Sequence, residues 1–170
     1  MSQRDSGYER KERDLYETPA WVTEALIPHI PGDVLEIWEP ACGSGKMVRE
    51  LERHGFTVHG TDIDQGFDFL TDLPPLSSTI VTNPPYVLAK EFIKLAIERS
   101  EFVAMLLRTD FDHAKTRSYL FGDCPSFAKK VVLTKRIQWF EDSKGAPSFN
   151  HAWFIWRSDN MGAPTLAYGP

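Results

Sequence analysis

The four consecutive residues Asn83-Pro84-Pro85-Tyr86 are of types that can activate a nitrogen nucleophile. The two prolines restrict the backbone and remove two amide donors, so carbonyl oxygens of this stretch are free to face a ligand. The Asn83 side-chain oxygen and the Pro84 carbonyl oxygen can accept both hydrogens of an NH2 group. Tyr86 can stack on the planar molecule that carries this group. An ordinary strand-ending turn with two prolines is the structural alternative.

The nature of an NH2 nitrogen explains why two acceptors matter. In an exocyclic amine or an amide, the lone pair is delocalised into the neighbouring π-system, so the nitrogen is a poor nucleophile. Two acceptors that draw the nitrogen towards tetrahedral geometry localise the lone pair. They also stabilise the positive charge that grows as the nitrogen attacks a sulfonium methyl group. The motif therefore predicts methyl transfer to a planar amino or amide nitrogen, without a strong base or a metal ion.

A glycine-containing segment at residues 39–45, Glu-Pro-Ala-Cys-Gly-Ser-Gly, follows the first apolar strand-like run. A Walker phosphate loop would need glycine at position 40 and Ser or Thr after Lys46, but the chain has Pro40 and Met47. A dinucleotide-binding turn would have Gly or Ala three residues after Gly45, where Val48 stands. The first of these phosphate-binding sites is excluded, and the second is disfavoured.

The remaining interpretation is a tight turn that lets the backbone approach a nucleoside-type ligand. Gly43 and Gly45 carry no side chain that would block this approach. Asp62 lies 17 positions beyond Gly45, at the end of the next strand, where it can accept hydrogen bonds from two ribose hydroxyls. The alternative is a purely structural turn with a surface aspartate.

Alternating strands and helices have to position these motifs. Thr18 can cap a first helix that has Pro19 in its first turn, and Gly55 can end the second helix. The expected strands are residues 33–38, 56–61, 78–82, 102–107, 131–137 and 152–156, with helices over 21–26, 47–51 and 88–96. This order predicts an α/β fold with a mostly parallel sheet, helices on both faces and ligands at the carboxyl ends of its strands.

Length and composition limit the organisation of the chain. Its 170 residues, 42% of them hydrophobic, suffice for one domain with a core but not for two. The two cysteines form no metal-binding or disulfide pattern, which favours a cytoplasmic location. The amino-terminal run of mixed charge has no apolar stretch, so neither a signal peptide nor a membrane partner is expected. A net charge of -5 argues against a surface that is basic throughout.

These motifs together resemble the amino-methyltransferases marked by an Asn/Asp-Pro-Pro-Tyr motif. Their order resembles that of the adenine-N6 DNA methyltransferases in which the cofactor motif precedes the catalytic one, and the resemblance covers roughly residues 16–110. The segments that carry it are Tyr16-Glu17-Thr18-Pro19, residues 39–45, Asp62, Asp68-Phe69-Leu70 and Asn83-Pro84-Pro85-Tyr86. The resemblance implies a Rossmann-like methyltransferase fold at residues 15–157, between a charged flexible arm at 1–14 and a flexible tail at 158–170.

The resemblance also implies S-adenosyl-L-methionine as the cofactor. Thr18 would contact its methionine carboxylate, Asp62 would hold its ribose, and Asp68 would accept from its adenine amine with Phe69 packed nearby. The implied cofactor-binding residues are Tyr16, Thr18, Glu39, Pro40, Ala41, Cys42, Gly43, Gly45, Asp62, Ile63, Asp68, Phe69 and Asn83. The implied catalytic residues are Asn83, Pro84, Pro85 and Tyr86, with no metal ligands.

Two departures from the family pattern affect these expectations. Only fifteen residues separate Gly66 from Thr82, so the helix and strand between the second and fourth family strands must be shortened or absent. Site-specific DNA enzymes of this type carry a target-recognition domain, and none of that size follows the catalytic motif here. A protein partner could supply selectivity, and a duplex substrate would need its target base flipped towards Tyr86.

Two later segments are candidates for contact with a substrate. Residues 112–136 hold six Lys or Arg against two Asp, an excess that could follow phosphates or could equally be a solvated face. Trp139 and Phe149 lie in and beside a loop between two strands, where either could stack on a displaced base. For Trp153, Phe154 and Trp156 we expect burial in a strand. The candidate substrate-binding residues are Tyr86, Lys115, Arg117, Trp139 and Phe149.

The preferred prediction is methylation of adenine N6 in nucleic acid, with DNA first. RNA bases, cytosine N4 and protein glutamine remain possible within the same chemistry. A different class of function is a non-catalytic cofactor-binding subunit of a larger complex. The presence of Asn83 and Tyr86 argues against that class, because such a subunit does not need a turn that localises a lone pair.

Overall fold

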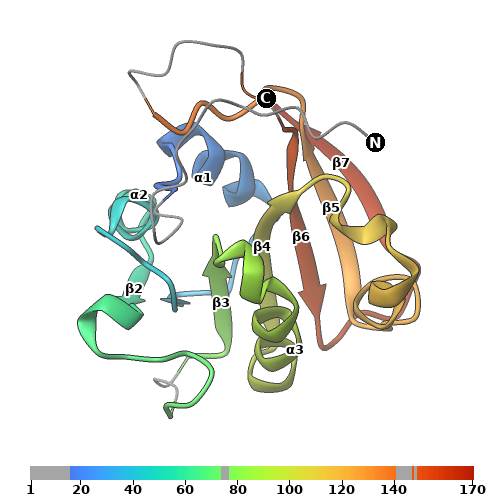
Figure 1. Cartoon of the computed structure of the whole chain (residues 1–170), viewed down its shortest axis with the longest axis horizontal. Coiled ribbons are helices and arrows are strands. Elements are labelled where there is room, and N and C mark those ends of the chain that lie inside the picture. Colours follow the sequence, from blue (N-terminus) through green and yellow to red (C-terminus); the bar gives the residue numbers. More distant parts are fainter. Residues whose placement is uncertain (1–15, 74–76, 141–146, 148) are drawn as a thin grey trace.

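The computed structural model describes residues 16–73, 77–140, 147 and 149–170. Its strands are β1 (Glu36–Glu39), β2 (Thr57–Gly60), β3 (Thr79–Thr82), β4 (Phe102–Arg108), β5 (Phe127–Leu133), β6 (His151–Arg157) and β7 (Thr165–Gly169). They form one seven-stranded sheet in the order β2-β1-β3-β4-β6-β5-β7 (Figure 1). Neighbouring strands are parallel except at β6, which is antiparallel to both β4 and β5. The predicted α/β fold with a mostly parallel sheet is confirmed.

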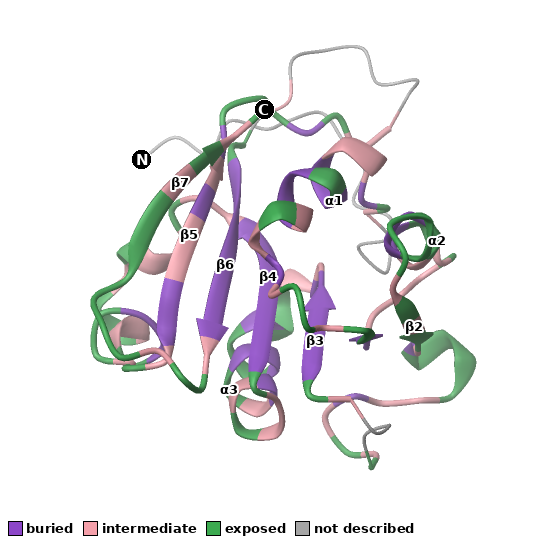
Figure 2. Cartoon of the chain, turned by 180° about the vertical axis from the view of Figure 1, so that it is seen from behind, coloured by how far each residue is buried: buried purple, intermediate pink, exposed green. Residues whose placement is uncertain are grey.

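Helices cover both faces of the sheet, as the sequence predicts. The α-helices are α1 (Ala20–Leu26), α2 (Lys46–Arg53) and α3 (Ala89–Arg99). Alternate side chains of β4 point to opposite faces: Leu106 packs in the core with α1 and α2, whereas Met105 and Leu107 pack in the core with α3. Because both faces are covered, β3, β4 and β6 are almost entirely buried (Figure 2). Trp153, Phe154 and Trp156 are buried in β6, as predicted.

The start of α1 differs from the prediction. The helix begins at Ala20, Pro19 occupies the N-cap position, and no side chain caps the helix. A residue that precedes proline avoids the helical region, so Thr18 stays outside the helix. Its side chain is buried instead of capping the first turn.

The connection between β2 and β3 is short, as the spacing predicts. Among its described residues, only the 3-10 turn η2 (Ile63–Gln65) is helical, and no strand forms there. No described strand covers the outer side of β2, which is the edge of the sheet and is mostly exposed. The carboxyl ends of β1, β2 and β3 therefore lie next to a short, open connection.

The carboxyl-terminal part of the chain corrects a prediction. Residues 158–170 were expected to be a flexible tail, but Thr165–Gly169 form β7, paired in parallel with β5 over five residues. The exposed, alternating side chains of β7 gave no apolar run to mark it as a strand, and its hydrogen bonds to β5 order it. The arm at residues 1–14 lies outside the described residues. Within the described part of the chain, no helix has the length and apolar character needed to cross a membrane.

Candidate active site

Glu39, the last residue of β1, is a buried carboxyl group that joins three elements. Its Oε1 accepts hydrogen bonds from the backbone N of Ala41 at 3.0 Å and from Thr82 Oγ1 at 2.5 Å. It thereby ties the end of β1 to the glycine turn and to the end of β3. Burial raises the pKa of Glu39 to about 8, against the effect of these two hydrogen bonds, and the nearby charge of Asp62 adds to the rise.

Asp62 fixes the glycine turn against the end of β2. One carboxylate oxygen accepts from Gly43 N at 2.8 Å, and the other accepts from Asp64 N at 2.9 Å. Gly43 and Gly45 have φ angles of 52° and 85°, which residues with a side chain rarely adopt, so the turn requires glycine. The structure thus brings the predicted turn and Asp62 together at the carboxyl ends of β1 and β2.

The segment before α1 lies across this turn and reaches the end of β3. Ser44 Oγ donates a hydrogen bond to the Glu17 carboxylate. Asn83 Nδ2 donates to the backbone oxygen of Tyr16 at 3.0 Å. The predicted cofactor residues of this region divide between the turn, with Pro40, Ala41, Cys42 and Gly45, and the segment before α1, with Tyr16 and Thr18. The glycine turn and the Asn83-Pro84-Pro85-Tyr86 motif are therefore adjacent in space, although about 40 residues separate them in the chain.

The amide oxygen of Asn83 is the most informative atom of the site. Because the Tyr16 carbonyl can only accept, it fixes the Asn83 amide with Nδ2 towards Tyr16 and Oδ1 facing away. Oδ1 is buried and has no hydrogen-bond partner in the described structure. Such a group ordinarily has a partner, since burying an acceptor without one costs free energy. The site therefore holds an acceptor that is suited to a donor from a ligand.

Tyr86 follows β3 and is held by a residue from β6. The Tyr86 hydroxyl lies 3.0 Å from Nε2 of His151, which is 2% exposed. Burial lowers the pKa of His151 to about 4, although the nearby Phe149 backbone acts in the opposite direction. The imidazole is therefore neutral near pH 7 and shares one hydrogen bond with the Tyr86 hydroxyl through Nε2, while its buried Nδ1 has no partner in the described structure.

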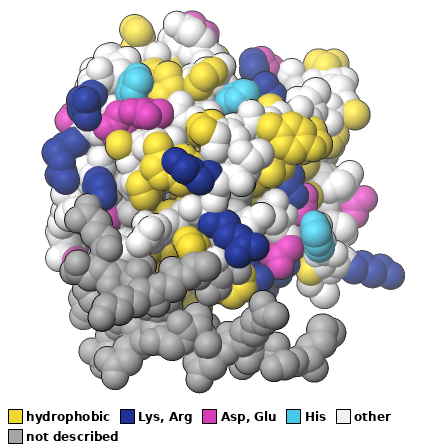
Figure 3. Space-filling view, turned by 90° about the horizontal axis from the view of Figure 1, so that it is seen from above, with side chains coloured by type: hydrophobic (Ala, Val, Ile, Leu, Met, Phe, Trp, Pro, Cys, Tyr) yellow, Lys and Arg dark blue, Asp and Glu magenta, His cyan; other side chains and the backbone are white. Residues whose placement is uncertain are grey.

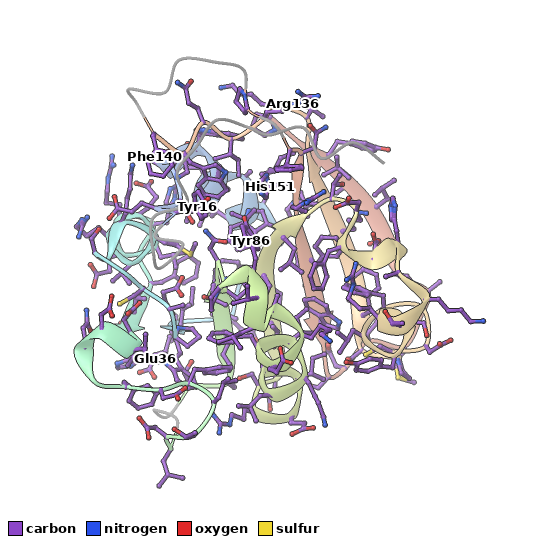
Figure 4. The ribbon with its side chains drawn as sticks, in the orientation of Figure 1. Tyr16, Glu36, Tyr86, Arg136, Phe140 and His151 are labelled. Atoms are coloured by element: carbon purple, nitrogen blue, oxygen red, sulfur yellow. The ribbon has the colours of Figure 1, made fainter. Side chains whose placement is uncertain are left out.

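Four aromatic side chains form a closed ring of contacts beside Asn83, which we call the aromatic ring. Tyr16 contacts Tyr86 at 6.2 Å and Trp139 at 5.3 Å between ring centroids, while His151 contacts Tyr86 at 6.2 Å and Trp139 at 5.2 Å. Phe140 packs on the outer side of Tyr16 (Figure 4). These residues come from four separate segments of the chain, so the fold assembles an aromatic surface next to an unpartnered acceptor.

The other predicted cofactor residues lie in the connection between β2 and β3. Asp68 Oδ1 accepts from Leu70 N at 2.9 Å, so this carboxylate is held in place by its own turn. Phe69 is buried against Trp38 and Phe92, with ring centroids at 5.1 and 4.6 Å, and belongs to the core. Ile63, next to Asp62 in the chain, is 67% exposed and offers an apolar side chain to a ligand beside the turn.

The predicted substrate residues divide into two groups. Trp139 is part of the aromatic ring, and the Phe149 ring lies under the guanidinium of Arg108. By contrast, Arg117 donates to the Phe111 backbone oxygen at 2.6 Å and stacks over the Phe111 ring. The segment with Lys115 and Arg117, η5 (Lys115–Leu120), lies over the face of the sheet that α3 covers, and its Leu120 oxygen accepts from Trp156 Nε1 near the end of β6 that is far from His151. The structure thus brings Trp139 against Tyr16 and His151, which both contact Tyr86, whereas Arg117 is engaged with Phe111 and takes no part in the aromatic ring.

Sequence reasoning missed His151 and Arg108 as members of the site. These two residues face each other in the antiparallel pairing of β4 and β6. A polar residue at the start of an otherwise apolar strand is a signal for His151, but its partner Tyr86 depends on strand register. Register between distant strands is not visible in a single sequence.

One group of described residues has metal-ligand types. Donor atoms of Glu24, Glu50 and His54 lie within 4.8 Å of one another on α1 and α2. Glu50 already pairs with Arg53 at 3.1 Å and with His54 at 3.3 Å. These pairs account for Glu50 and His54, and the cluster lies outside the site around Asn83.

Comparison with known proteins identifies the fold. No protein family matches the sequence, and no curated protein is similar to it. Among solved structures, a chain from Listeria monocytogenes assigned as a class I S-adenosylmethionine-dependent methyltransferase has a TM-score of 0.59 and 12% identity over 88% of this chain. The chain has the Rossmann-like methyltransferase fold.

Two modification subunits of restriction systems share this fold. The type I restriction-modification methyltransferase subunit from Streptococcus thermophilus has a TM-score of 0.59 and 11% identity over 85% of this chain. The modification subunit from Vibrio vulnificus, assigned to a type I restriction enzyme, has a TM-score of 0.59 and 12% identity over 90% of this chain. This chain spans 62% of the Listeria protein and 45% and 46% of the two subunits.

Proposed function

We propose that this protein is an S-adenosylmethionine-dependent N-methyltransferase whose preferred substrate is the N6 amine of adenine in nucleic acid, with DNA first. The observation that carries the proposal is the buried, unpartnered Oδ1 of Asn83 at the carboxyl end of β3. It lies beside the aromatic ring and next to a glycine turn held by Asp62. Acceptor, aromatic surface and nucleoside-type turn occur together at the edge where parallel sheets bind ligands.

The residues around the turn fit the proposed cofactor. Gly43 and Gly45 leave the backbone open to a ligand, and the Asp62 carboxylate is oriented by two backbone N–H groups. The exposed Ile63 side chain offers an apolar contact for a purine, and the Asp68 carboxylate lies a few residues further along the same connection. When bound, S-adenosylmethionine supplies an electrophilic methyl group on a sulfonium sulfur.

The residues of the chain act on the target amine. Asn83 Oδ1 accepts one N–H, and the Pro84 carbonyl accepts the other. The Pro85 carbonyl already accepts from Leu88 N at 2.9 Å and therefore belongs to the turn. The two acceptors localise the nitrogen lone pair and stabilise the positive charge that grows on nitrogen. Tyr86, with its hydroxyl bound to His151, provides a fixed aromatic face for the base that carries the amine.

Two observations support a nucleobase over a protein glutamine. The aromatic ring suits a planar heteroaromatic group, since base–aromatic stacking contributes about 1–3 kcal/mol per base. Solved structures with this fold include modification subunits of restriction systems. Since these neighbours are subunits of restriction systems, we propose that a protein partner supplies sequence selectivity to this chain as well.

The test is transfer of labelled methyl from S-adenosylmethionine to separate pools of duplex DNA, single-stranded DNA, RNA and cell protein. We expect N6-methyladenine in DNA. Asn83→Ala should lower the rate by about 10²–10³-fold, as for the loss of one group that stabilises a charged transition state. Asn83→Asp keeps an acceptor oxygen and should retain more activity than Asn83→Ala.

Asn160→Ala is the matched control. The Asn160 amide also donates to a backbone carbonyl, that of Pro125 at 2.8 Å, but it lies in the connection before β7. This variant should methylate as the wild type does. Label found only in protein or RNA would overturn adenine in DNA as the substrate but would leave the proposed methyl-transfer chemistry in place. Cofactor binding without transfer to any pool would favour a non-catalytic subunit instead.

A further inference from the structure

A second aromatic feature lies outside the aromatic ring, at the end of β4. Arg108, the last residue of β4, places its guanidinium carbon 3.9 Å from the centroid of the Phe149 ring. Phe149 remains 47% exposed, so the guanidinium covers only part of this ring. The uncovered part of the ring offers an aromatic face, already paired with a cation, on which a planar group can stack.

The Arg108–Phe149 pair is adjacent to the aromatic ring but separate from it. Arg108 pairs in register with His151, whose imidazole bonds to the Tyr86 hydroxyl. Phe149 takes part in none of the ring contacts between Tyr16, Tyr86, Trp139 and His151. Phe149 therefore lies two residues from His151 in the chain but is not part of the aromatic ring.

Positive charge accompanies this exposed ring. Arg136, just after β5, donates from Nε to Asn150 Oδ1 at 2.7 Å and from Nη1 to the Pro147 oxygen at 3.1 Å. Both partners are neutral, and no described carboxylate forms an ion pair with Arg136. Arg136 lies beyond His151 on the outer side of the site (Figure 4). Apolar and basic side chains also lie side by side on this face of the molecule (Figure 3).

One hydrogen-bond donor of Arg108 has no acceptor in the described structure. Its Nη2 donates to Asp110 Oδ2 at 3.0 Å, but its Nε is buried and has no partner in the described structure. A buried guanidinium N–H without an acceptor is costly and is commonly satisfied by an anion or a water molecule. An anionic oxygen near Phe149 would accept a hydrogen bond from this N–H group.

We propose that Phe149, Arg108 and Arg136 bind the nucleotide next to the target base, so that the substrate is an unpaired strand. This inference rests on the proposed function. The base of the flanking nucleotide stacks on the open face of Phe149, and its phosphate lies between the two guanidinium groups. A base in a duplex is stacked on its neighbours, so an unpaired strand fits this arrangement better.

The test compares kcat/KM for deoxyadenosine with kcat/KM for a short single-stranded DNA that contains one adenine. In the wild type, the oligonucleotide is the better substrate. Phe149→Ala should lower the oligonucleotide-to-nucleoside ratio by roughly 5- to 150-fold, the range expected for loss of one stacked base, with the change mainly in KM. Arg136→Gln should lower the same ratio. The same sequence as RNA and as duplex DNA shows whether single-stranded DNA, RNA or duplex DNA is the preferred substrate.

The matched control is Tyr119→Ala, which removes an aromatic ring that is 50% exposed, close to the exposure of Phe149, but belongs to η5 (Lys115–Leu120), a segment that contacts α3 and takes no part in the aromatic ring. It should leave the ratio unchanged. An equal effect of Phe149→Ala on both substrates, or no effect, would overturn the inference. If the wild type methylates no nucleic acid, the proposed function fails. Fluorescence anisotropy of the labelled oligonucleotide then still tests Phe149, since equal affinity of wild type and Phe149→Ala would overturn the subsite independently.

Discussion

Tyr86 and His151 form a pair whose contribution can be measured separately from the Tyr86 ring. Tyr86→Phe keeps the aromatic face but removes the hydroxyl that lies 3.0 Å from His151 Nε2. A neutral hydrogen bond of this kind contributes about 0.5–1.5 kcal/mol, so we expect methyl transfer to fall roughly two- to tenfold. His151→Ala should cost more, because it also removes a ring that contacts Trp139. The measurement is kcat and KM for each variant.

A double-mutant cycle isolates the hydrogen bond between these two residues. Tyr86→Phe should have little effect once His151 is alanine, because the acceptor is already gone. Losses that simply add in the double variant would show that His151 does not act through the Tyr86 hydroxyl. Tyr119→Phe, which changes an exposed tyrosine away from the site, is the control for the loss of a phenol group.

Single residues also show where sequence reasoning succeeds. Asn83, Tyr86, Gly43 and Asp62 could be selected because their types and spacing have chemical meaning, and the structure brings all four to one edge of the sheet. His151 could not be assigned its partner, because the β4–β6 register that places it opposite Arg108 is a tertiary property. The roles of the predicted cofactor and substrate residues remain predictions.

Among the elements, β1, the glycine turn and β3 meet at Glu39, and this junction predicts a pH dependence of stability. Burial raises the pKa of Glu39 to about 8, from 4.5 as its ordinary value. Between these values the folded protein keeps a proton that the unfolded chain releases, so rising pH destabilises the fold. His151 acts in the opposite direction, but only between its pKa of about 4 and its ordinary value of 6.5. From pH 6.5 to 8, the Glu39 effect is therefore not offset by His151.

Over this interval we expect the free energy of unfolding to fall by about 2 kcal/mol, since each pH unit corresponds to about 1.4 kcal/mol for one proton. Denaturant titration at a series of pH values measures it. Glu39→Gln should remove the fall, because an amide does not titrate. Glu36→Gln, at the exposed start of the same strand, should keep it. A fall of equal size in Glu39→Gln would assign the proton to another group.

The last strand gives a second prediction about elements. β7 pairs with β5 over five residues, and the Gly169 oxygen accepts from Thr134 Oγ1 at 2.9 Å. Removing residues 164–170 leaves β5 without a neighbour on that side and should lower the thermal midpoint by several degrees. Methyl transfer by the protein that remains folded should persist, because β4, β6 and β5 lie between β7 and β3.

Removal of residue 170 alone, which lies beyond β7, is the control for this truncation and should leave the thermal midpoint unchanged. If the longer truncation left the midpoint unchanged as well, pairing with β5 would not stabilise the protein. If it abolished transfer at a temperature where the protein stays folded, β7 would have a direct part in the site.

The elements that sequence predicted well are those with a strong apolar pattern. β3, β4 and β6 are buried on both faces, so each reads as an apolar run, and α3 has a clear apolar face. β5 begins at Phe127, four residues before its predicted start at 131, because the half-buried Lys129 and Lys130 interrupt the apolar pattern. β7 was missed for a related reason, since an edge strand has few buried side chains. In both cases the strand is defined by backbone hydrogen bonds to a neighbouring strand, and these cannot be read from a single sequence.

For the whole molecule, the distribution of charge matters more than its sum. A net charge of -5 repels a polyanion, so binding of a nucleic acid has to rely on local groups and stacking. The basic residues of 112–136 are dispersed: Arg117 is held at Phe111, and Lys130 pairs with Asp112 at 3.0 Å. Arg136, together with Arg108 from β4, remains near the site. The sequence located an excess of positive charge, but the fold decides which charges can reach a phosphate.

This arrangement predicts a weak dependence of nucleic-acid binding on salt. Each neutralised phosphate of a single strand contributes about 0.7 to the slope of log affinity against log salt concentration, so the one phosphate between Arg108 and Arg136 predicts a slope of about -0.7. Arg136→Gln should move this slope towards zero. Fluorescence anisotropy of a labelled oligonucleotide over a range of salt concentrations measures both values. If Lys115→Gln reduced the slope and Arg136→Gln did not, the strand would run past Lys115 and Arg117, two candidate substrate-binding residues suggested by the sequence alone, and the path along Phe149 would be wrong.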